Sequence, residues 1–246
     1  SLPLTSLMPA DVPDVYMNWA NLLFLHWRVE PAAMRPLVPE PLELDLFDGS
    51  AWIAIVPFRM EQNVFRGVPR LPGLANFHEC NVRTYVKYRG KAGVWFFSLD
   101  AQTLLPVLGG RWLWNLNYVY SRFDVSQTGN GTQRVTDYRL TRRHGPWHAG
   151  HSHIKWRTGE PLPTAQPGSL EHFLTERYWL FTRRGRGTRA RILSGEVRHS
   201  PWSLREAELL HRQPFADLRY LSLTEQIAPM SPGAQDRRPI QSIQAN

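Results

Sequence analysis

Residues 77–101, "FHECNVRTYVKYRGKAGVWFFSLDA", predict two strands joined by a tight turn. Successive side chains of a strand point to opposite faces, so one face of the first strand carries Glu79, Asn81, Arg83 and Tyr85. The second strand is apolar at nearly every position, which is typical of a strand covered on both faces. Together the two strands predict a polar patch inside a mostly apolar enclosure.

Similar strand-like stretches recur along the chain, separated by turns rich in Gly, Pro, Asp and Asn. Two short helices are expected at 30–38 and 169–177, with Ser169 as the N-cap of the second and Glu171 in its first turn. This pattern predicts a mainly β fold, an antiparallel barrel or sandwich with two short helices. The expected strands cover residues 21–29, 51–60, 77–88, 93–101, 114–125, 135–143, 152–158, 177–184 and 190–199.

Composition indicates a globular chain, because 42% of the 246 residues are hydrophobic and 12% are aromatic. We expect a single domain over residues 1–230 and a polar, loose tail over 231–246. No run is long enough for a transmembrane helix, and the start of the chain does not resemble a secretory signal. Cys80 is the single cysteine, so no internal disulfide forms and a cytoplasmic location is expected.

The formal net charge is +8, and arginine supplies nearly all of the positive charge. The densest run, "RRGRGTRAR" at 183–191, contains glycines that favour a solvated basic hairpin tip. No zinc-finger, helix-turn-helix or RNA-binding aromatic pattern is present. We therefore expect no nucleic-acid partner, and a basic nucleic-acid-associated protein remains the weaker alternative.

A histidine cluster at 144–153 raises the question of a metal site. His151 and His153 would share a strand face, as two imidazole ligands require. No carboxylate or cysteine lies beside them in the sequence, and glycines interrupt the run that begins with His144 and His148. Surface histidines are the preferred interpretation, with no metal expected.

Five sequence blocks lie between about residues 19 and 204: "LLFLHWRV", "PLELDLFDGSAWIAIVPFRM", "FHECNVRTYVKYRGKAGVWFFSLDA", "SLEHFLTERYWLF" and "GEVRHSPWSL". Together they resemble the DUF2071 family of YqjF-like proteins, which is similar in fold to acetoacetate decarboxylase. The resemblance implies a barrel-like, cone-shaped sheet assembly around an enclosed apolar cavity.

The resemblance to the decarboxylase also implies site residues. It places Arg28 on an active-site arginine and Glu79 on an active-site glutamate, whereas Trp52 stands near the position of a second glutamate. Tyr118 and Val119 replace the adjacent lysines of the decarboxylase, one of which forms its Schiff base. A Schiff base needs a primary amine, which that enzyme makes nucleophilic by desolvation beside a second cation. Because tyrosine cannot form an imine, we expect no Schiff-base decarboxylation.

We therefore expect a cavity that binds a small organic acid or ketone without a cofactor. Glu79, Tyr118 and Arg28 are the candidate catalytic residues, for enolisation, hydration or imine-independent decarboxylation. An enzyme of this kind would be a lyase or isomerase; a non-catalytic binding or scaffold protein is the alternative, and the oligomeric state, including a homo-oligomer, stays open. Candidate substrate-binding residues are Arg28, His26, Asn81, Arg83, Asp100 and Trp52.

Overall fold

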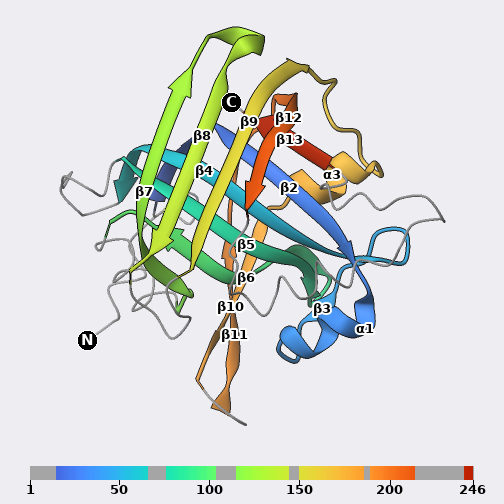
Figure 1. The fold of residues 1–246 in the computed structure, drawn as a ribbon. Helices are drawn as coiled ribbons and strands as arrows, with labels where there is room; N and C mark the ends of the chain where they lie inside the picture. Colours follow the sequence, from blue (N-terminus) through green and yellow to red (C-terminus); the bar gives the residue numbers. More distant parts are fainter. Residues whose placement is uncertain are drawn as a thin grey trace.

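The computed structural model describes residues 15–65, 76–103, 115–143, 150–185, 189–213 and 241–245. Its strands form one sheet that curls into a barrel-like shape (Figure 1). The strands are β1 (Val15–Ala20), β2 (Leu22–Val29), β3 (Glu43–Leu44), β4 (Ala51–Phe65), β5 (Phe77–Tyr88), β6 (Lys91–Ala101), β7 (Tyr118–Thr128), β8 (Val135–Arg142), β9 (His151–Pro161), β10 (Trp179–Arg184), β11 (Arg191–Glu196), β12 (Leu204–Gln213) and β13 (Gln241–Ala245).

The helical segments are short. The first is α1 (Pro31–Met34), followed by the 3₁₀ turn η2 (Arg35–Leu37); a second 3₁₀ turn, η3 (Gly131–Gln133), precedes β8. The helix α3 (Leu170–Thr175) begins after Ser169, whose hydroxyl accepts a hydrogen bond from the backbone N–H of His172. The predicted N-cap is therefore confirmed, because a cap side chain satisfies an N–H that has no partner inside the helix.

The sheet closes through a sequence of neighbouring strands that returns to its starting point. The pairs run from β5 through β6, β7, β8, β9, β12, β13, β2 and β4 back to β5. Most pairs are antiparallel, as predicted, but β6 pairs in parallel with both β7 and β10. The prediction of a mainly β barrel with two short helices is confirmed, with the correction that the sheet is mixed.

The turn between β5 and β6 explains their close pairing. Arg89 and Gly90 both have positive φ, at 50° and 75°, as a two-residue hairpin turn of the right twist requires. Ten register pairs then connect the strands, from Tyr88 opposite Lys91 to Glu79 opposite Ala101. The hairpin predicted from residues 77–101 is thus present, with one bulge between Val82 and Arg83.

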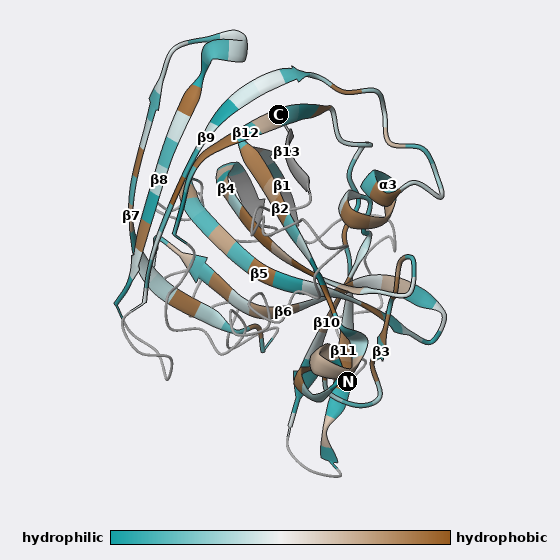
Figure 2. Cartoon of the chain, turned by 45° about the vertical axis from the view of Figure 1, so that its right-hand side comes forward, coloured by the Kyte–Doolittle hydropathy of each residue, from teal (hydrophilic) through white to brown (hydrophobic). Residues whose placement is uncertain are grey.

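Each face of the curled sheet carries its own apolar cluster. The first cluster includes Trp27, Cys80 and Trp156, and the strands β7, β8 and β9 contribute to it with alternate residues. The second includes Trp52 and Leu174, and α3 packs against it. Hydrophilic and hydrophobic residues alternate along β7 and β8 (Figure 2), so the sheet separates two environments, and a side chain's parity along its strand decides which one it enters.

The region predicted as a loose tail contains regular structure. The strand β13 lies within residues 231–246 and pairs with β2 and β12. The predicted tail therefore includes a strand that connects β12 to β2 in the sheet.

Candidate functional site

The centre of the candidate site is a hydrogen bond between Glu79 and Tyr118. Glu79 lies on β5 opposite Ala101, whereas Tyr118, the first residue of β7, lies beside Leu99 of β6. Leu99 is also opposite Asn81, which shares a face of β5 with Glu79. The register therefore places the side chains of Glu79 and Tyr118 on one face of the sheet. The Tyr118 hydroxyl donates to Oε2 of Glu79 at 3.3 Å.

Burial dominates the electrostatics of this pair. Glu79 is 1% exposed, and its burial raises the pKa of its carboxyl to about 8, although hydrogen bonds from Asn81 and Tyr118 act in the opposite direction. Burial also raises the pKa of Tyr118 well above its ordinary value. At neutral pH both groups therefore hold their protons, and Glu79 becomes a carboxylate base just above neutrality.

Tyr138, which the sequence interpretation missed, holds the backbone of this site. Its hydroxyl, on β8, donates to the backbone carbonyl of Glu79 at 2.8 Å, and its ring packs edge-on against Phe123. The contact fixes β5 from the opposite face of the sheet. Alternation along β8 indicates that Tyr138 points inward, but no sequence signal connects it with Glu79.

His26 and Arg83 lie on the same face as Glu79 but belong to a separate cluster beneath α3. The Nε2 atom of His26 lies 2.8 Å from the hydroxyl of Tyr85, which donates to the carbonyl of Leu174 at 2.9 Å. Arg83 donates to the same carbonyl at 3.2 Å. Burial and the neighbouring guanidinium of Arg83 lower the pKa of His26. A neutral imidazole here thus helps to hold the end of α3.

Arg28 and Trp52 form a third group of candidate residues, which lies far from Glu79 along the strands. Arg28 pairs with Trp52 in the register of β2 and β4, and its guanidinium lies 5.2 Å from the Trp52 ring centroid. Phe58, opposite Glu79, is six residues farther along β4, so Arg28 and Glu79 are about 20 Å apart by strand rise. Arg28 instead forms an ion pair with Asp48 at 3.5 Å.

Asp100 lies on the opposite face of the sheet from Glu79. It pairs in register with Cys80, and its carboxylate accepts hydrogen bonds from Arg142 at 2.6 and 2.8 Å and from the Ser121 hydroxyl at 2.7 Å. Asp100 and Arg142 are both buried. Their ion pair is a closed internal network, and the structure does not bring Asp100 to the Glu79 side chain.

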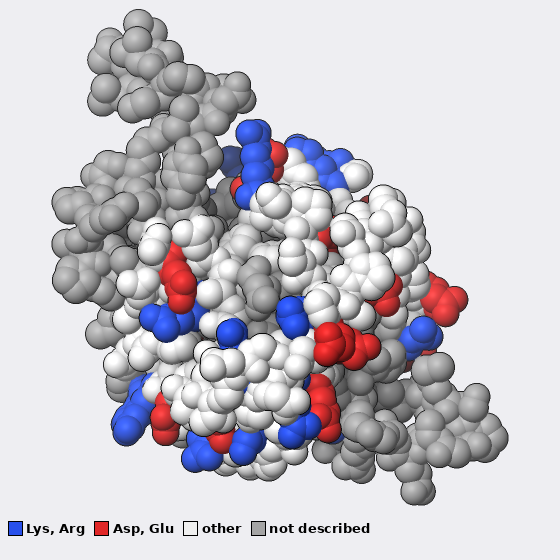
Figure 3. All heavy atoms as spheres, turned by 90° about the horizontal axis from the view of Figure 1, so that it is seen from above, with Lys and Arg blue, Asp and Glu red and all other residues white. Residues whose placement is uncertain are grey.

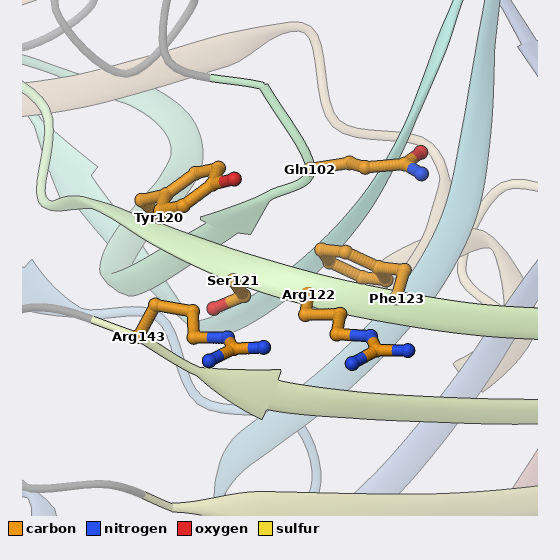
Figure 4. Close-up of a pocket in the computed structure, with 6 residues that line it drawn as sticks. All are labelled: Gln102, Tyr120, Ser121, Arg122, Phe123 and Arg143. Carbon is orange, nitrogen blue, oxygen red and sulfur yellow. The ribbon is translucent and has the colours of Figure 1, made fainter.

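A pocket of about 420 Å³ lies beside β7, the strand that carries Tyr118 of the Glu79–Tyr118 pair. Tyr120 of β7, one of its lining residues, stands beside Ala101, which is opposite Glu79. Figure 4 shows the lining side chains around β7 where the neighbouring β6 ends. The pocket is lined by Gln102, Tyr120, Ser121, Arg122, Phe123 and Arg143.

His151, His153 and Cys80 are the described members of the predicted metal-site candidates. His153 contacts Asp137 at 3.0 Å, and its ring centroid lies 4.3 Å from that of His211 with the planes tilted by 40°. No group of three or more potential ligands gathers within the part of the chain that the structure describes. His144 and His148 lie outside the described residues. Burial raises the pKa of Cys80, which disfavours a reactive thiolate.

The surface carries mixed charge. Lys and Arg are interspersed with Asp and Glu over the described part of the face seen from above (Figure 3). In the basic run at 183–191, Arg184 and Arg191 are opposite each other on the exposed β10–β11 hairpin. Among the described helices, none is long and apolar enough to span a membrane.

Comparison with solved structures identifies the fold. The enduracididine biosynthesis enzyme MppR, solved in complex with pyruvate, superposes with a TM-score of 0.62 at 18% identity, covering 100% of this chain and 91% of that one. An acetoacetate decarboxylase-like enzyme from Sphingomonas wittichii RW1 gives 0.58 at 13% identity, covering 95% and 89%. At these identities the likeness shows a shared acetoacetate decarboxylase-like fold.

Sequence relatives give the family. An acetoacetate decarboxylase of Acidiphilium cryptum (strain JF-5) is 29% identical over 114 residues, which cover 46% of this chain and 41% of that enzyme. The uncharacterized protein YqjF of Bacillus subtilis (strain 168) is 38% identical over 202 residues, covering 80% of this chain and 79% of the relative. The model of DUF2071, described as an uncharacterized conserved protein, matches residues 16–234. The chain therefore belongs to the DUF2071 family.

Proposed function

We propose that this protein binds a small organic acid or ketone and catalyses proton transfer at the Glu79–Tyr118 pair. The observation that carries the proposal is a buried carboxyl whose pKa is raised to about 8 and which a tyrosine hydroxyl contacts at 3.3 Å. A catalytic base is most effective when its pKa lies near the working pH. A carboxyl displaced this far from its ordinary pKa is typical of a functional site.

The pair can carry out enolisation. The Glu79 carboxylate takes a proton from the carbon beside a carbonyl, the electrons of the broken C–H bond form the C=C bond, and the carbonyl oxygen becomes an enolate. Tyr118, whose high pKa keeps it neutral, donates a hydrogen bond to that oxygen. Return of the proton from Glu79 to another atom completes an isomerisation, so the carboxylate is regenerated without an added cofactor.

An imine mechanism would require a lysine amine beside Glu79 and Tyr118. The three lysines of the chain are Lys87, Lys91 and Lys155. The ammonium of Lys87 forms an ion pair with Asp45 at 2.7 Å, and that of Lys91 lies 3.6 Å from the Trp179 ring centroid. Lys155 is on β9, in register with Asp137 and His211. We therefore propose chemistry that proceeds without a Schiff base.

Ligands of structural neighbours support the proposed substrate class. MppR has been solved with pyruvate and with the condensation product of pyruvate and imidazole 4-carboxaldehyde. Both contain carbons beside a carbonyl or carboxylate, which is where a base such as Glu79 would act. Non-catalytic ligand binding is the second candidate function, and the 1% exposure of Glu79 favours it because a base must reach its substrate.

Turnover measurements separate the two candidates. Pyruvate, acetoacetate and acetone would be incubated with the wild type, Glu79→Gln and Tyr118→Phe, and their consumption followed by NMR. Tyr178→Phe is the matched control, because Tyr178 also donates to a buried carboxylate, that of Glu176 at 2.6 Å, outside the proposed site.

We expect Glu79→Gln to reduce turnover by about 10²–10⁴-fold, the usual contribution of a general base, and Tyr178→Phe to leave it within about threefold of the wild type by the same standard. Binding without turnover in the wild type would support the non-catalytic candidate instead. Equal turnover in the wild type and Glu79→Gln would rule out the assigned base.

A further inference from the structure

The pocket beside β7 contains two arginines in adjacent positions. Arg122 is in register with Thr141 of β8, and the backbone N–H of Arg143 donates to the carbonyl of Tyr120. The two arginines are therefore diagonal neighbours on one face of the β7–β8 pair, a spacing that long side chains bridge. Figure 4 shows both guanidinium groups extending along β7 in the same direction.

The charge of these arginines is not neutralised within the described residues, where neither Arg122 nor Arg143 forms an ion pair. The lining Ser121 hydroxyl donates to the buried Asp100 at 2.7 Å, and Asp124, two residues after Arg122 on β7, forms no ion pair with that arginine among the described residues. Asp100 is already paired with the buried Arg142 at 2.6 Å. The pocket therefore has an excess of positive charge, which favours an anion.

The other lining groups indicate an organic anion. Tyr120 contributes an aromatic ring on the same face as the two arginines, and Gln102 contributes an amide, whereas the ring of Phe123 packs on Tyr138 at the opposite face. A volume of about 420 Å³ is within the range of small-molecule sites. A guanidinium group matches the planar geometry of a carboxylate, and the Tyr120 ring adds apolar contact that an inorganic ion cannot use.

We propose that this pocket binds a small organic carboxylate, held by Arg122 and Arg143 beside the ring of Tyr120. Exposed ion pairs contribute little when isolated, so the site depends on two guanidinium groups acting on one ligand. The inference does not rest on chemistry at Glu79. A Glu79→Gln variant should retain this binding even where it loses turnover.

NMR titrations of the full chain with benzoate, pyruvate and inorganic phosphate test the proposal. The variants are Arg122→Gln/Arg143→Gln and Arg122→Lys/Arg143→Lys. The matched control is Arg184→Gln/Arg191→Gln, which removes the same charge from two cross-strand neighbours on the exposed β10–β11 hairpin. Thermal unfolding of every variant establishes that it is folded.

We expect the Gln double variant to weaken benzoate and pyruvate binding about tenfold or more, the scale of one charge-assisted contact. The Lys double variant should weaken it as well, since lysine keeps the charge but loses the planar fork. The hairpin control should bind as the wild type does. Equal weakening by the hairpin control, phosphate binding as tight as that of both organic acids, or no binding by the wild type would each overturn the proposal.

Discussion

From the raised pKa of Glu79 we predict how the free energy of unfolding depends on pH, a dependence that can be measured without a substrate. The pKa of this buried carboxyl rises from 4.5 to about 8 on folding, so between these values the folded state binds a proton that the unfolded state releases. Stability from this group is therefore fully present below pH 4.5 and is lost progressively as the pH rises through the folded-state pKa of about 8. Each unit of pKa difference corresponds to about 1.4 kcal/mol, which gives about 4 kcal/mol lost between pH 5 and 9.

The substitution Glu79→Gln removes the titrating group and keeps the side-chain shape. Urea unfolding of the wild type and the variant at pH 5, 7 and 9 would give the free energy of unfolding at each pH. Other titrating groups, including His78, whose pKa burial lowers to about 4, occur in both proteins and cancel in the difference. We expect the wild type to lose about 4 kcal/mol more than the variant from pH 5 to 9. A difference below about 1 kcal/mol would refute the reasoning, because Glu79 would then titrate near its ordinary pKa.

Three further predictions concern stability and mechanism. Asp100→Ala leaves the buried Arg142 without its carboxylate partner and should cost about 3–5 kcal/mol in urea unfolding; a loss under about 1 kcal/mol would contradict this. Gly93→Ala should destabilise the protein by about 1–3 kcal/mol, because its Cβ would lie 2.4 Å from the Trp179 carbonyl oxygen; an unchanged melting temperature would show that β10 can move. Borohydride treatment with acetoacetate should leave Lys87, Lys91 and Lys155 unlabelled by mass spectrometry, and a folding-dependent adduct would restore the imine mechanism.

Local sequence patterns were sufficient to predict the β5–β6 hairpin and the N-cap of α3. Alternation along residues 77–88 places Glu79 and Asn81 on one face, and a Ser169 hydroxyl suits a helix start. Parallel pairing of β6 with β7 was not predictable in the same way. The partner of a strand is chosen by contacts between distant segments, and no local residue distinguishes a parallel neighbour from an antiparallel one.

Four strands, β1, β3, β12 and β13, lie outside the ranges predicted from the sequence, and β12 and β13 were missed for different reasons. Residues 204–213, "LREAELLHRQ", alternate between more and less buried positions in β12, but their charged and helix-favouring residues hide the pattern. The strand β13 follows a polar segment and lies between β12 and β2. Its place depends on tertiary pairing, which short-range propensity does not encode.

Alternation along β5 is enough to select Glu79 as a candidate, but its contact with Tyr118 forms across the intervening β6. Tyr118 was predicted as a site residue from the family resemblance alone. Its distance from Glu79 depends on the register of three strands, which the sequence does not specify. The same register separates Arg28 from Glu79 along β4 and places Asp100 opposite Cys80 on the other face. Parity along one strand is readable from the sequence, whereas the register between strands is not.

Deuterium exchange tests the proposed proton transfer most directly. Pyruvate, acetoacetate and acetone would be incubated in D₂O with the wild type or Glu79→Gln, and the exchange at the carbon beside the carbonyl followed by NMR between about pH 6 and 10. Because the carboxylate form of Glu79 is the base, we predict for at least one of them an exchange rate that rises with pH through a midpoint near the pKa of about 8. The rise should be absent in Glu79→Gln. Exchange rates that are the same in both proteins at every pH would contradict the assignment of Glu79 as the base.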